Sequence, residues 1–390
     1  MRVSTGLSEF DRVLGGGIVH GGVALLSGDP GIGKSTVLLQ TAAKVSTTEP
    51  VLYITGEESL QQVSARAKRL GLNADGIHAL AETQVESIQA EIERIKPRLV
   101  VVDSIQTLYT GRVDSAPGSV TQVRESTALL IQQAKQTQTA MLLVGHVTKD
   151  GNVAGPKVLE HMVDTVIQFE GDTQTPYRLM RAIKNRFGAA NELGAFEMDE
   201  NGLTSVDNAS AMFLNEDYAG TIGSAICVVQ EGPRPILVEI QALLDPMQGN
   251  NPKRLGIGVD TNRFAMIMAV INKHLKHPVG NMDAFVSAVG GIRAAEPGCD
   301  LPILLALCSS FLETPTPHGM CAFGEMSLTG EIRPVQMAVT RIQEAAKLGF
   351  TKILVPERNL KGKLPAMPNG VELVGVKNLA QALRQTEKWS

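Results

Sequence analysis

Residues 28–36 read GDPGIGKST, a glycine-rich stretch that ends in Lys-Ser-Thr. Its glycines permit backbone angles that turn successive N–H groups toward a phosphate. The stretch follows an aliphatic run and precedes a helical pattern, so a helix N-terminus adds partial positive charge. The pattern G-x-x-x-x-G-K-[ST] in this context predicts a nucleotide phosphate loop. Its residues are Gly28, Asp29, Pro30, Gly31, Ile32, Gly33, Lys34, Ser35 and Thr36.

A metal ion is expected beside this loop. Lys34 supplies a charge for the β- and γ-phosphates of ATP, and the Ser35 hydroxyl is a ligand for Mg²⁺. Asp103 ends the aliphatic run 99–102, and a carboxylate at the tip of a buried parallel strand can hold Mg²⁺ through water. Taken alone, Asp103 could equally be a turn cap. Together with Lys34 it predicts an ATP and Mg²⁺ site.

Two further strand ends carry candidates for hydrolysis. Glu57 and Glu58 follow the run 51–55, and Glu57 is the candidate that orients and deprotonates the attacking water. The alternative is that both acids cap the next helix. His146 follows the run 140–144 and is a candidate sensor of the γ-phosphate, or else a solvated residue at a strand end.

The string KNRFG places two cations beside an aromatic residue and a turn glycine. Lys184 and Arg186 are close enough to contact one phosphate, from ATP on a neighbouring subunit or from DNA. By spacing alone, a solvated charged turn is the competing interpretation. The residues of the string are Lys184, Asn185, Arg186, Phe187 and Gly188.

The elements that position these residues alternate between strands and helices. Buried strands are expected at 23–27, 51–55, 99–102, 140–144 and 165–169. Amphipathic helices are expected at 35–45, 60–70, 85–95 and 119–136. This alternation predicts a parallel sheet flanked by helices, with a surface loop at 109–118.

The periodicity lapses near residues 207–210, which predicts two domains, 1–210 and 211–390. The second domain begins with a hairpin-like strand pair, 222–230 and 235–243. It continues with helical patterns at 263–275, 300–312 and 335–348, and with short strands at 285–289, 352–355 and 371–374. These patterns predict a second α/β or α+β domain with a mixed sheet.

Composition narrows the class of protein. The chain has 390 residues, 43% of them hydrophobic, and a net charge of −4, which excludes wholesale disorder and a uniformly basic surface. Its four cysteines include no CxxC pair, so no zinc module is expected. The longest apolar stretch, 301–312, is shorter than the roughly 20 residues that span a bilayer. With no visible signal peptide, a cytoplasmic protein without membrane contact is expected.

Four strings together resemble the RadA (Sms) family of bacterial DNA repair proteins: GEES at 56–59, HVTKDG at 146–151, AGPKVLEH at 154–161 and KNRFG at 184–188. The resemblance runs from Ser4 to the C-terminus. It implies a RecA-like P-loop ATPase core, a parallel sheet flanked by helices, followed by a Lon-protease-like α/β domain. It also implies a homo-hexameric ring that hydrolyses ATP and drives branch migration with the RecA recombinase on single-stranded and branched DNA.

The resemblance also implies roles for individual residues. Lys34, Ser35 and Asp103 match the nucleotide and Mg²⁺ positions, and Glu57 matches the glutamate that activates water. Lys184 and Arg186 would act across a subunit interface or on DNA. Candidates for DNA contact in the loops are Arg112, Lys149 and Lys157. Most members begin with a four-cysteine zinc module, which this sequence lacks, so neither zinc nor partner recruitment through that module is expected.

The second domain resembles Lon proteases without their catalytic pair. Gly298 stands at the position of the serine nucleophile and Val339 at that of the lysine base, so no protease activity is expected. Cys299, one residue away, is interpreted as packing. Lys253, Arg254 and Arg263 are candidates for a DNA platform or are scattered solvated charges.

Several functions remain open beside the motor. They are a RecA-like ATP-dependent switch or scaffold without motor activity, a clock-type kinase, an inactive protease adaptor and a purely structural DNA-binding ring.

Overall fold

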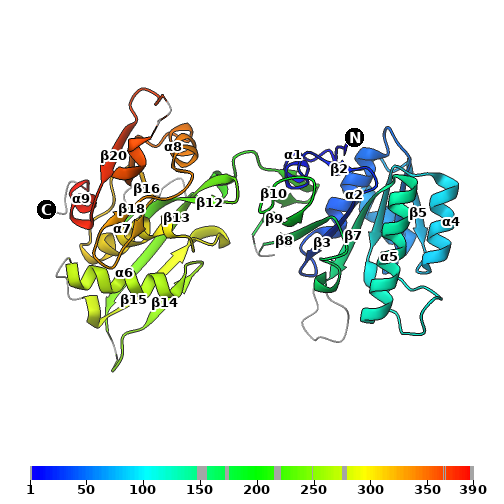
Figure 1. Cartoon of the computed structure of the whole chain (residues 1–390), viewed down its shortest axis with the longest axis horizontal. Helices are drawn as coiled ribbons and strands as arrows, with labels where there is room; N and C mark the ends of the chain where they lie inside the picture. The colour runs from blue at the N-terminus through cyan, green and yellow to red at the C-terminus, as the bar shows by residue number, and fades with distance from the viewer. Residues whose placement is uncertain are drawn as a thin grey trace. The chain divides into compact units, whose positions relative to one another are not determined.

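The computed structural model describes residues 2–146, 156–171, 175–214, 221–247, 249–274, 279–362, 364 and 366–386. The chain forms two compact units, unit 1 (1–207) and unit 2 (208–390), each built around its own sheet (Figure 1). No described helix is both long enough and apolar enough to cross a membrane.

Unit 1 contains a nine-stranded sheet in the order β11-β10-β9-β8-β3-β7-β6-β4-β5. Its strands are β3 (Val23–Gly28), β4 (Val51–Thr55), β5 (Ile77–Ala81), β6 (Leu99–Asp103), β7 (Ala140–His146), β8 (Thr165–Glu170), β9 (Tyr177–Asn185), β10 (Leu193–Asp199) and β11 (Gly202–Ser205). The strands from β8 to β5 are parallel, and β9, β10 and β11 extend the sheet antiparallel. A separate pair, β1 (Arg2–Val3) and β2 (Ile18–Val19), lies outside it.

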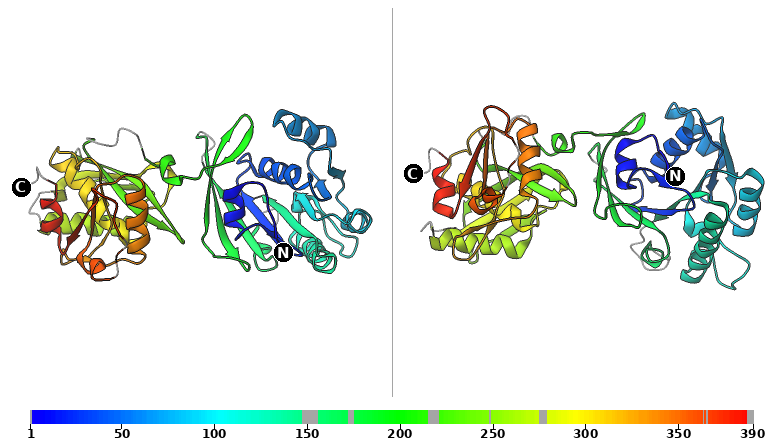
Figure 2. Two further views of the ribbon diagram at one scale, coloured as in Figure 1. Left: turned by 90° about the horizontal axis from the view of Figure 1, so that it is seen from above. Right: turned by 45° about the horizontal axis from the view of Figure 1, so that its top comes forward.

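Helices cover both faces of this sheet because its central strands are apolar on both sides. Successive residues of β4 show the alternation: Tyr53 packs into one hydrophobic cluster and Ile54 into the other. The first cluster includes α1 (Ser8–Val13), α2 (Lys34–Val45) and α3 (Leu60–Arg69). The second includes α4 (Val85–Ile95) and α5 (Val120–Thr137). Figure 2 shows the layers from two further directions.

The sheet is larger than the parallel sheet expected from the sequence, because β5 and the antiparallel β9–β11 went unrecognised. In β9 the sequence YRLMRAIKN mixes cations with apolar residues, so neither a continuous apolar run nor a clean alternation marks the strand. Lys184 and Asn185 are its last two residues, so two of the five residues of the expected charged turn are strand.

Unit 2 contains a seven-stranded mixed sheet in the order β14-β15-β13-β12-β16-β19-β20. Its strands are β12 (Ser224–Glu231), β13 (Arg234–Pro246), β14 (Arg254–Ile257), β15 (Met282–Ala288), β16 (Met320–Ala322), β19 (Lys352–Pro356) and β20 (Glu372–Val376), with β17 (Glu325–Met326) and β18 (Ile332–Arg333) as a separate pair. The helices are α6 (Thr261–His274), α7 (Asp300–Phe311), α8 (Ala338–Lys347) and α9 (Leu379–Arg384). Helix α8 packs on one face of the sheet through Ile342 and Ala345, and α7 packs against β12 and β13.

Candidate phosphate-binding site

The glycine-rich loop connects the end of β3 to the start of α2. Gly28 and Gly33 both have positive φ, 155° and 117°, which other residues rarely adopt. A Cβ on Gly28 would lie 2.5 Å from the carbonyl oxygen of Phe169, and one on Gly33 would lie 2.4 Å from Cε of Met198. Gly28 has no room for a side chain because the opposing atom belongs to the backbone of β8. At Gly33 the opposing atom is the flexible end of the Met198 side chain, so there it is the positive φ that requires glycine.

Lys34 lies inside this loop with a relative exposure of only 4%. Its Nζ donates to the carbonyl oxygens of Gly28 (2.8 Å) and Asp29 (2.9 Å). Burial lowers the pKa of Lys34, while the nearby carboxylates of Asp103, Asp29 and Glu57 oppose that shift. A nucleotide phosphate would compete with the two carbonyl oxygens for this ammonium group. The charged phosphate is a stronger hydrogen-bond acceptor than the neutral carbonyls.

Strand register gathers the other candidates at the same end of the sheet. Gly28 pairs with His146 across β3 and β7, and Thr55 pairs with Asp103 across β4 and β6. The carboxyl ends of parallel strands meet at one edge, where ligands bind in open α/β sheets. Asp103, His146 and Glu57, which follows β4, therefore lie at the edge from which the phosphate loop begins.

Asp103 is buried at 7% exposure and is held by a tyrosine from the neighbouring strand. The Tyr53 hydroxyl donates to Oδ2 of Asp103 (3.0 Å). Burial, together with the charge of Asp103 and this hydrogen bond, raises the pKa of Tyr53 well above its usual value, so the phenol remains a donor. A carboxylate fixed by a second residue, together with the hydroxyl of Ser35 in the first turn of α2, offers the hard oxygen ligands that Mg²⁺ prefers. The residues present fit that ion.

Glu57 is held between two neighbours. Its Oε1 accepts a hydrogen bond from the Ser104 hydroxyl (2.6 Å) and lies 3.2 Å from Nε2 of His146. The His146 contact lowers the pKa of Glu57 to about 2; Ser104 and the charges of His146 and Lys34 add to this shift, and burial opposes it. With this low pKa Glu57 is an ionised carboxylate, and its side chain, which is 45% exposed, is within reach of water.

Glu58 points elsewhere and forms an ion pair with Arg66. Neither Glu57 nor Glu58 caps α3. Ser59 is the cap: its hydroxyl accepts from the backbone N–H of Gln62, and the Gln62 side chain accepts from the backbone N–H of Ser59. The S-x-x-Q spacing of this capping box is a sequence signal for a cap at Ser59, and sequence reasoning did not use it.

Sequence reasoning missed three residues that support the site: Tyr53, Ser104 and Gln106. Gln106 donates from Nε2 to the backbone carbonyl of His146 (3.2 Å) and is 8% exposed. A tyrosine within an otherwise aliphatic buried strand was the one available signal, because a buried phenol needs a polar partner. Ser104 and Gln106 carry no comparable signal.

A hollow of 410 Å³ opens beside the first turn of α2. It is lined by Thr36, Arg69 and Leu70, and by residues 198–202, where β10 ends and β11 begins. Apolar and polar side chains thus share its walls next to the last residue of the phosphate loop.

The KNRFG string lies far from this edge within its own chain. Lys184 pairs with Val166 in β8, and β8 pairs with β3 near Ala24, at the opposite end of β3 from Gly28. At about 3.3 Å per residue, the four residue steps from Ala24 to Gly28 separate the two places by roughly 13 Å along the strand. The structure therefore does not bring Lys184 and Arg186 to the phosphate loop of the same chain.

Within unit 1, both cations of the string have partners. Lys184 Nζ donates to the carbonyl oxygens of Glu160 and Val163, each at 2.8 Å. Burial and the neighbouring Arg186 lower the pKa of Lys184. Arg186 contacts Asp164 (3.2 Å), whose other oxygen accepts from the backbone N–H of Val23.

The remaining residues of the string anchor it to the N-terminal segment. Asn185 donates to the carbonyl oxygen of Val13 (3.2 Å), and the Phe187 carbonyl accepts from Arg2 (2.6 Å). Gly188 packs directly against the backbone of Gly15.

The DNA candidates have different surroundings. Arg112 is exposed in the loop that follows β6, and Lys157 is exposed at the start of the segment that leads to β8. Lys149 lies outside the described residues. In unit 2, Lys253 is exposed, but Arg254 donates to backbone carbonyls of the segment 279–282 and Arg263 forms an ion pair with the buried Asp300. Arg254 and Arg263 thus have internal roles that weaken them as parts of a DNA surface.

A salt bridge lies beside Gly298, the residue that the sequence aligns with the Lon nucleophile. Arg341, which is 1% exposed, binds both carboxylate oxygens of Glu296 at 2.7 Å and donates to the Val228 carbonyl. A Cβ on Gly298 would lie 3.0 Å from Nη1 of Arg341. Val339 is 39% exposed, and Cys299 is fully buried, where the adjacent Cys227 and burial raise its pKa. A thiol in that setting is not a nucleophile.

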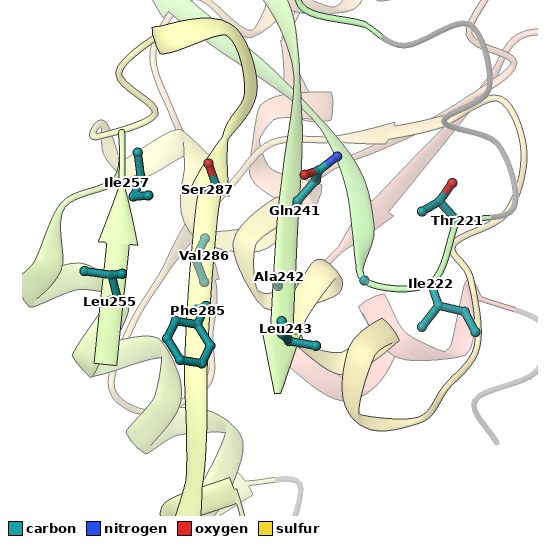
Figure 3. A pocket seen from close by; sticks show the side chains of 11 residues that line it. Thr221, Ile222, Gln241, Ala242, Leu243, Leu255, Ile257, Phe285, Val286 and Ser287 are labelled. Carbon is teal, nitrogen blue, oxygen red and sulfur yellow. The ribbon is translucent and has the colours of Figure 1, made fainter. Parts of the chain in front are cut away.

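A second hollow, of 450 Å³, lies on the sheet of unit 2 (Figure 3). Leu243, Leu255, Ile257 and Phe285 line it, and none of the described residues around it is charged. It therefore lacks what a phosphate site requires.

Two family models match the chain. One, described as "ATPase: KaiC", matches residues 3–205, and the other, described as "Subunit ChlI of Mg-chelatase", matches residues 268–359. With the two α/β units, these matches confirm the predicted fold class, a RecA-like ATPase core followed by a Lon-protease-like domain.

Curated relatives match nearly the whole chain. The DNA repair protein RadA of Bacillus subtilis (strain 168) is 51% identical over 384 residues, which is 98% of this chain and 83% of that protein. The DNA repair proteins RadA of Pseudomonas aeruginosa and of Escherichia coli (strain K12) are each 50% identical over 382 residues, covering 98% of this chain and 84% and 82% of those proteins. A crystal structure of the RadB recombinase aligns with 52% of this chain and 99% of its own, with a TM-score of 0.43 and 21% identity.

Proposed function

The chain belongs to the RadA family of DNA repair proteins, and from that premise we propose that it is a DNA-dependent ATPase that works as a motor in recombinational repair. It hydrolyses ATP with Mg²⁺ and drives branch migration on single-stranded and branched DNA together with the RecA recombinase, as a cytoplasmic homo-hexamer. The observation that carries the proposal is the placing of Lys34, Glu57 and Asp103 at one edge of the sheet, at the mouth of the phosphate loop.

Each side chain at this edge has one task in the proposed reaction. The loop N–H groups and Lys34 bind the phosphates, with Lys34 leaving the carbonyls of Gly28 and Asp29. Ser35 and Asp103 hold Mg²⁺, which when bound neutralises charge on the phosphates. Glu57 orients a water molecule and accepts its proton, and His146 contacts the γ-phosphate end of the site. The nucleoside lies in the hollow beside Thr36.

Lys184 and Arg186 act on a neighbouring subunit or on DNA. Their distance from the phosphate loop of their own chain supports this assignment, because one chain alone does not bring the two sites together. Hydrolysis on one subunit then changes contacts on the next, and the DNA-contacting loops move with the nucleotide state.

Phosphate contacts on DNA are proposed for Arg112, Lys149 and Lys157. Such contacts bind without reading sequence and weaken as salt rises. Unit 2 serves as a scaffold of the ring and not as a protease, because Gly298 and Val339 replace both catalytic residues and Arg341 fills the space beside Gly298.

The test is ATP hydrolysis with and without single-stranded DNA, in wild type, Lys34→Ala and Lys184→Ala. We expect DNA to stimulate wild-type turnover, Lys34→Ala to abolish all turnover, and Lys184→Ala to abolish the stimulation. Turnover that ignores DNA in the wild type would contradict the motor.

The match to an "ATPase: KaiC" model favours one second candidate, an ATP-dependent switch that transfers phosphate to itself. Incubation with γ-labelled ATP distinguishes the two. A motor releases labelled inorganic phosphate and stays unlabelled, whereas a self-modifying switch retains label on the protein.

A further inference from the structure

Arg178, in β9, is a buried cation next to the phosphate loop that has no role in the function proposed above. Its relative exposure is 5%. Its Nε donates to the carbonyl oxygen of Ile32 in the loop (3.2 Å). Its Nη1 donates to the carbonyl oxygens of Thr175 and Tyr177, just before it in the chain. One guanidinium therefore ties the segment that enters β9 to the phosphate loop.

The carbonyl that Arg178 binds determines the direction of an N–H group in the loop. The Ile32 carbonyl and the Gly33 N–H belong to one planar trans peptide, in which they point in opposite directions. Holding the carbonyl toward β9 therefore turns the Gly33 N–H away from β9. Gly33 is the residue that caps the N-terminus of α2, where backbone N–H groups bind anions.

A glycine-rich loop needs such an external support. Because Gly31 and Gly33 have no side chains, the peptide groups next to them, just before α2, rotate more freely than they would beside other residues. Binding a phosphate to a freely rotating loop would cost the free energy of ordering it, and a loop held in place beforehand avoids that cost. The close packing of Gly33 on Met198 limits the space around the loop, but only a hydrogen bond selects the orientation of the peptide.

We propose that Arg178 is a positioning residue for nucleotide binding, which holds the Ile32–Gly33 peptide so that its N–H faces the phosphates. The inference rests on the proposed nucleotide site and adds a determinant of its affinity. Charge strengthens the effect, because a guanidinium on the carbonyl polarises the peptide and makes its N–H a better donor.

The test measures the dissociation constant of fluorescent ADP with Mg²⁺ for the full chain. Arg178→Met keeps the apolar part of the side chain and removes every donor. We expect binding about tenfold weaker, the loss that corresponds to one charged hydrogen bond. The matched control is Arg181→Met on the same strand, since Arg181 lies near Glu170 (3.6 Å), and it is expected to bind as wild type does.

Steady-state hydrolysis separates positioning from a general loss of structure. Weaker preorganisation raises KM for ATP about tenfold and leaves kcat within about twofold at saturating ATP. A merely structural role would instead lower the unfolding temperature without nucleotide and leave the dissociation constant of the folded fraction unchanged. That outcome, or equal affinities for Arg178→Met and Arg181→Met, overturns the inference.

Two further measurements keep the result decisive. If Arg178→Met does not fold, Arg178→Lys replaces it: one ammonium does not reproduce the fork, so binding about two- to threefold weaker is expected, and unchanged binding contradicts the inference. Lys34→Ala tests the site itself. If wild type does not bind ADP, or binds it no better than Lys34→Ala does, the proposed nucleotide site fails, whichever way Arg178 behaves.

Discussion

The hydroxyl of Ser104 donates a 2.6 Å hydrogen bond to Oε1 of Glu57. This contact connects the residue after β6 to the loop after β4. Strand β6 ends in Asp103, the proposed metal ligand, and the next residue, Ser104, orients Glu57, the proposed base. Nε2 of His146, at the end of β7, lies 3.2 Å from the same oxygen, so the carboxylate faces residues from two strands. Its direction is therefore set before any substrate binds.

We expect Ser104→Ala to lower kcat for ATP hydrolysis by roughly tenfold while KM changes little. The hydrogen bond to a charged acceptor is worth about 1.5 kcal/mol, and it acts on the base and not on the phosphates. Steady-state kinetics at saturating Mg²⁺ measure this. Ser87→Ala, on the surface of α4, is the control, and an equal loss in both variants would contradict the assignment.

The contact between Glu57 and His146 should make the stability of the folded protein depend on pH in the acid range. The folded-state pKa of Glu57 is about 2, below its ordinary value of 4.5. A depressed carboxyl pKa contributes stability that is complete above pH 4.5 and is lost as pH falls toward 2. His146→Gln removes the main cause of the shift, so the difference in unfolding temperature between wild type and His146→Gln should shrink between pH 6 and pH 3. A constant difference would show that Glu57 is not depressed by His146.

Arg341 should be essential to the stability of unit 2. Arg341→Met leaves the Glu296 carboxylate without its cation and the Val228 carbonyl without its donor. Breaking a buried pair on one side costs about 3 kcal/mol or more. Urea unfolding, followed by the fluorescence of a probe in unit 2, measures the loss. Arg333→Met, on an exposed residue that contacts Glu331 at 3.8 Å, is expected to cost less than 1 kcal/mol.

Restoring the Lon pair should not restore proteolysis. In Gly298→Ser/Val339→Lys the new serine would lie against Nη1 of Arg341, which is 3.0 Å from the ideal Cβ position. The serine would meet a cation paired with Glu296 and not a free lysine base. Hydrolysis of a fluorogenic peptide by the double variant, at a rate above that of wild type, would contradict this expectation.

The proposed DNA contact of Arg112 predicts a change in salt dependence. Each phosphate contact with single-stranded DNA contributes about 0.7 to the slope of log K against log salt. Arg112→Ala should therefore reduce the slope by about that amount. Arg94→Ala is the control, because Arg94 is exposed on α4 and paired with Glu91, and an unchanged slope for Arg112→Ala would exclude the contact.

The sequence by itself determined the phosphate loop and the central strands. A strand, a glycine turn and a helix N-terminus are contiguous in the chain, so the order of residues 23–45 already contains the geometry that binds phosphate. The buried strands were equally visible, because a strand covered on both faces must be apolar at every position. Strand β9 could not be recognised in this way, because it mixes arginines with aliphatic residues.

The tertiary structure decided which distant residues meet. Glu57, Ser104 and His146 come together because β4, β6 and β7 are neighbours in the sheet, and no spacing along the chain encodes that order. The same holds for Arg178 beside Ile32 and for Arg341 beside Gly298. In each case the two residues are distant in the sequence and belong to different elements. Local motifs follow from backbone geometry, whereas these contacts depend on how elements pack, a global property of the folded chain.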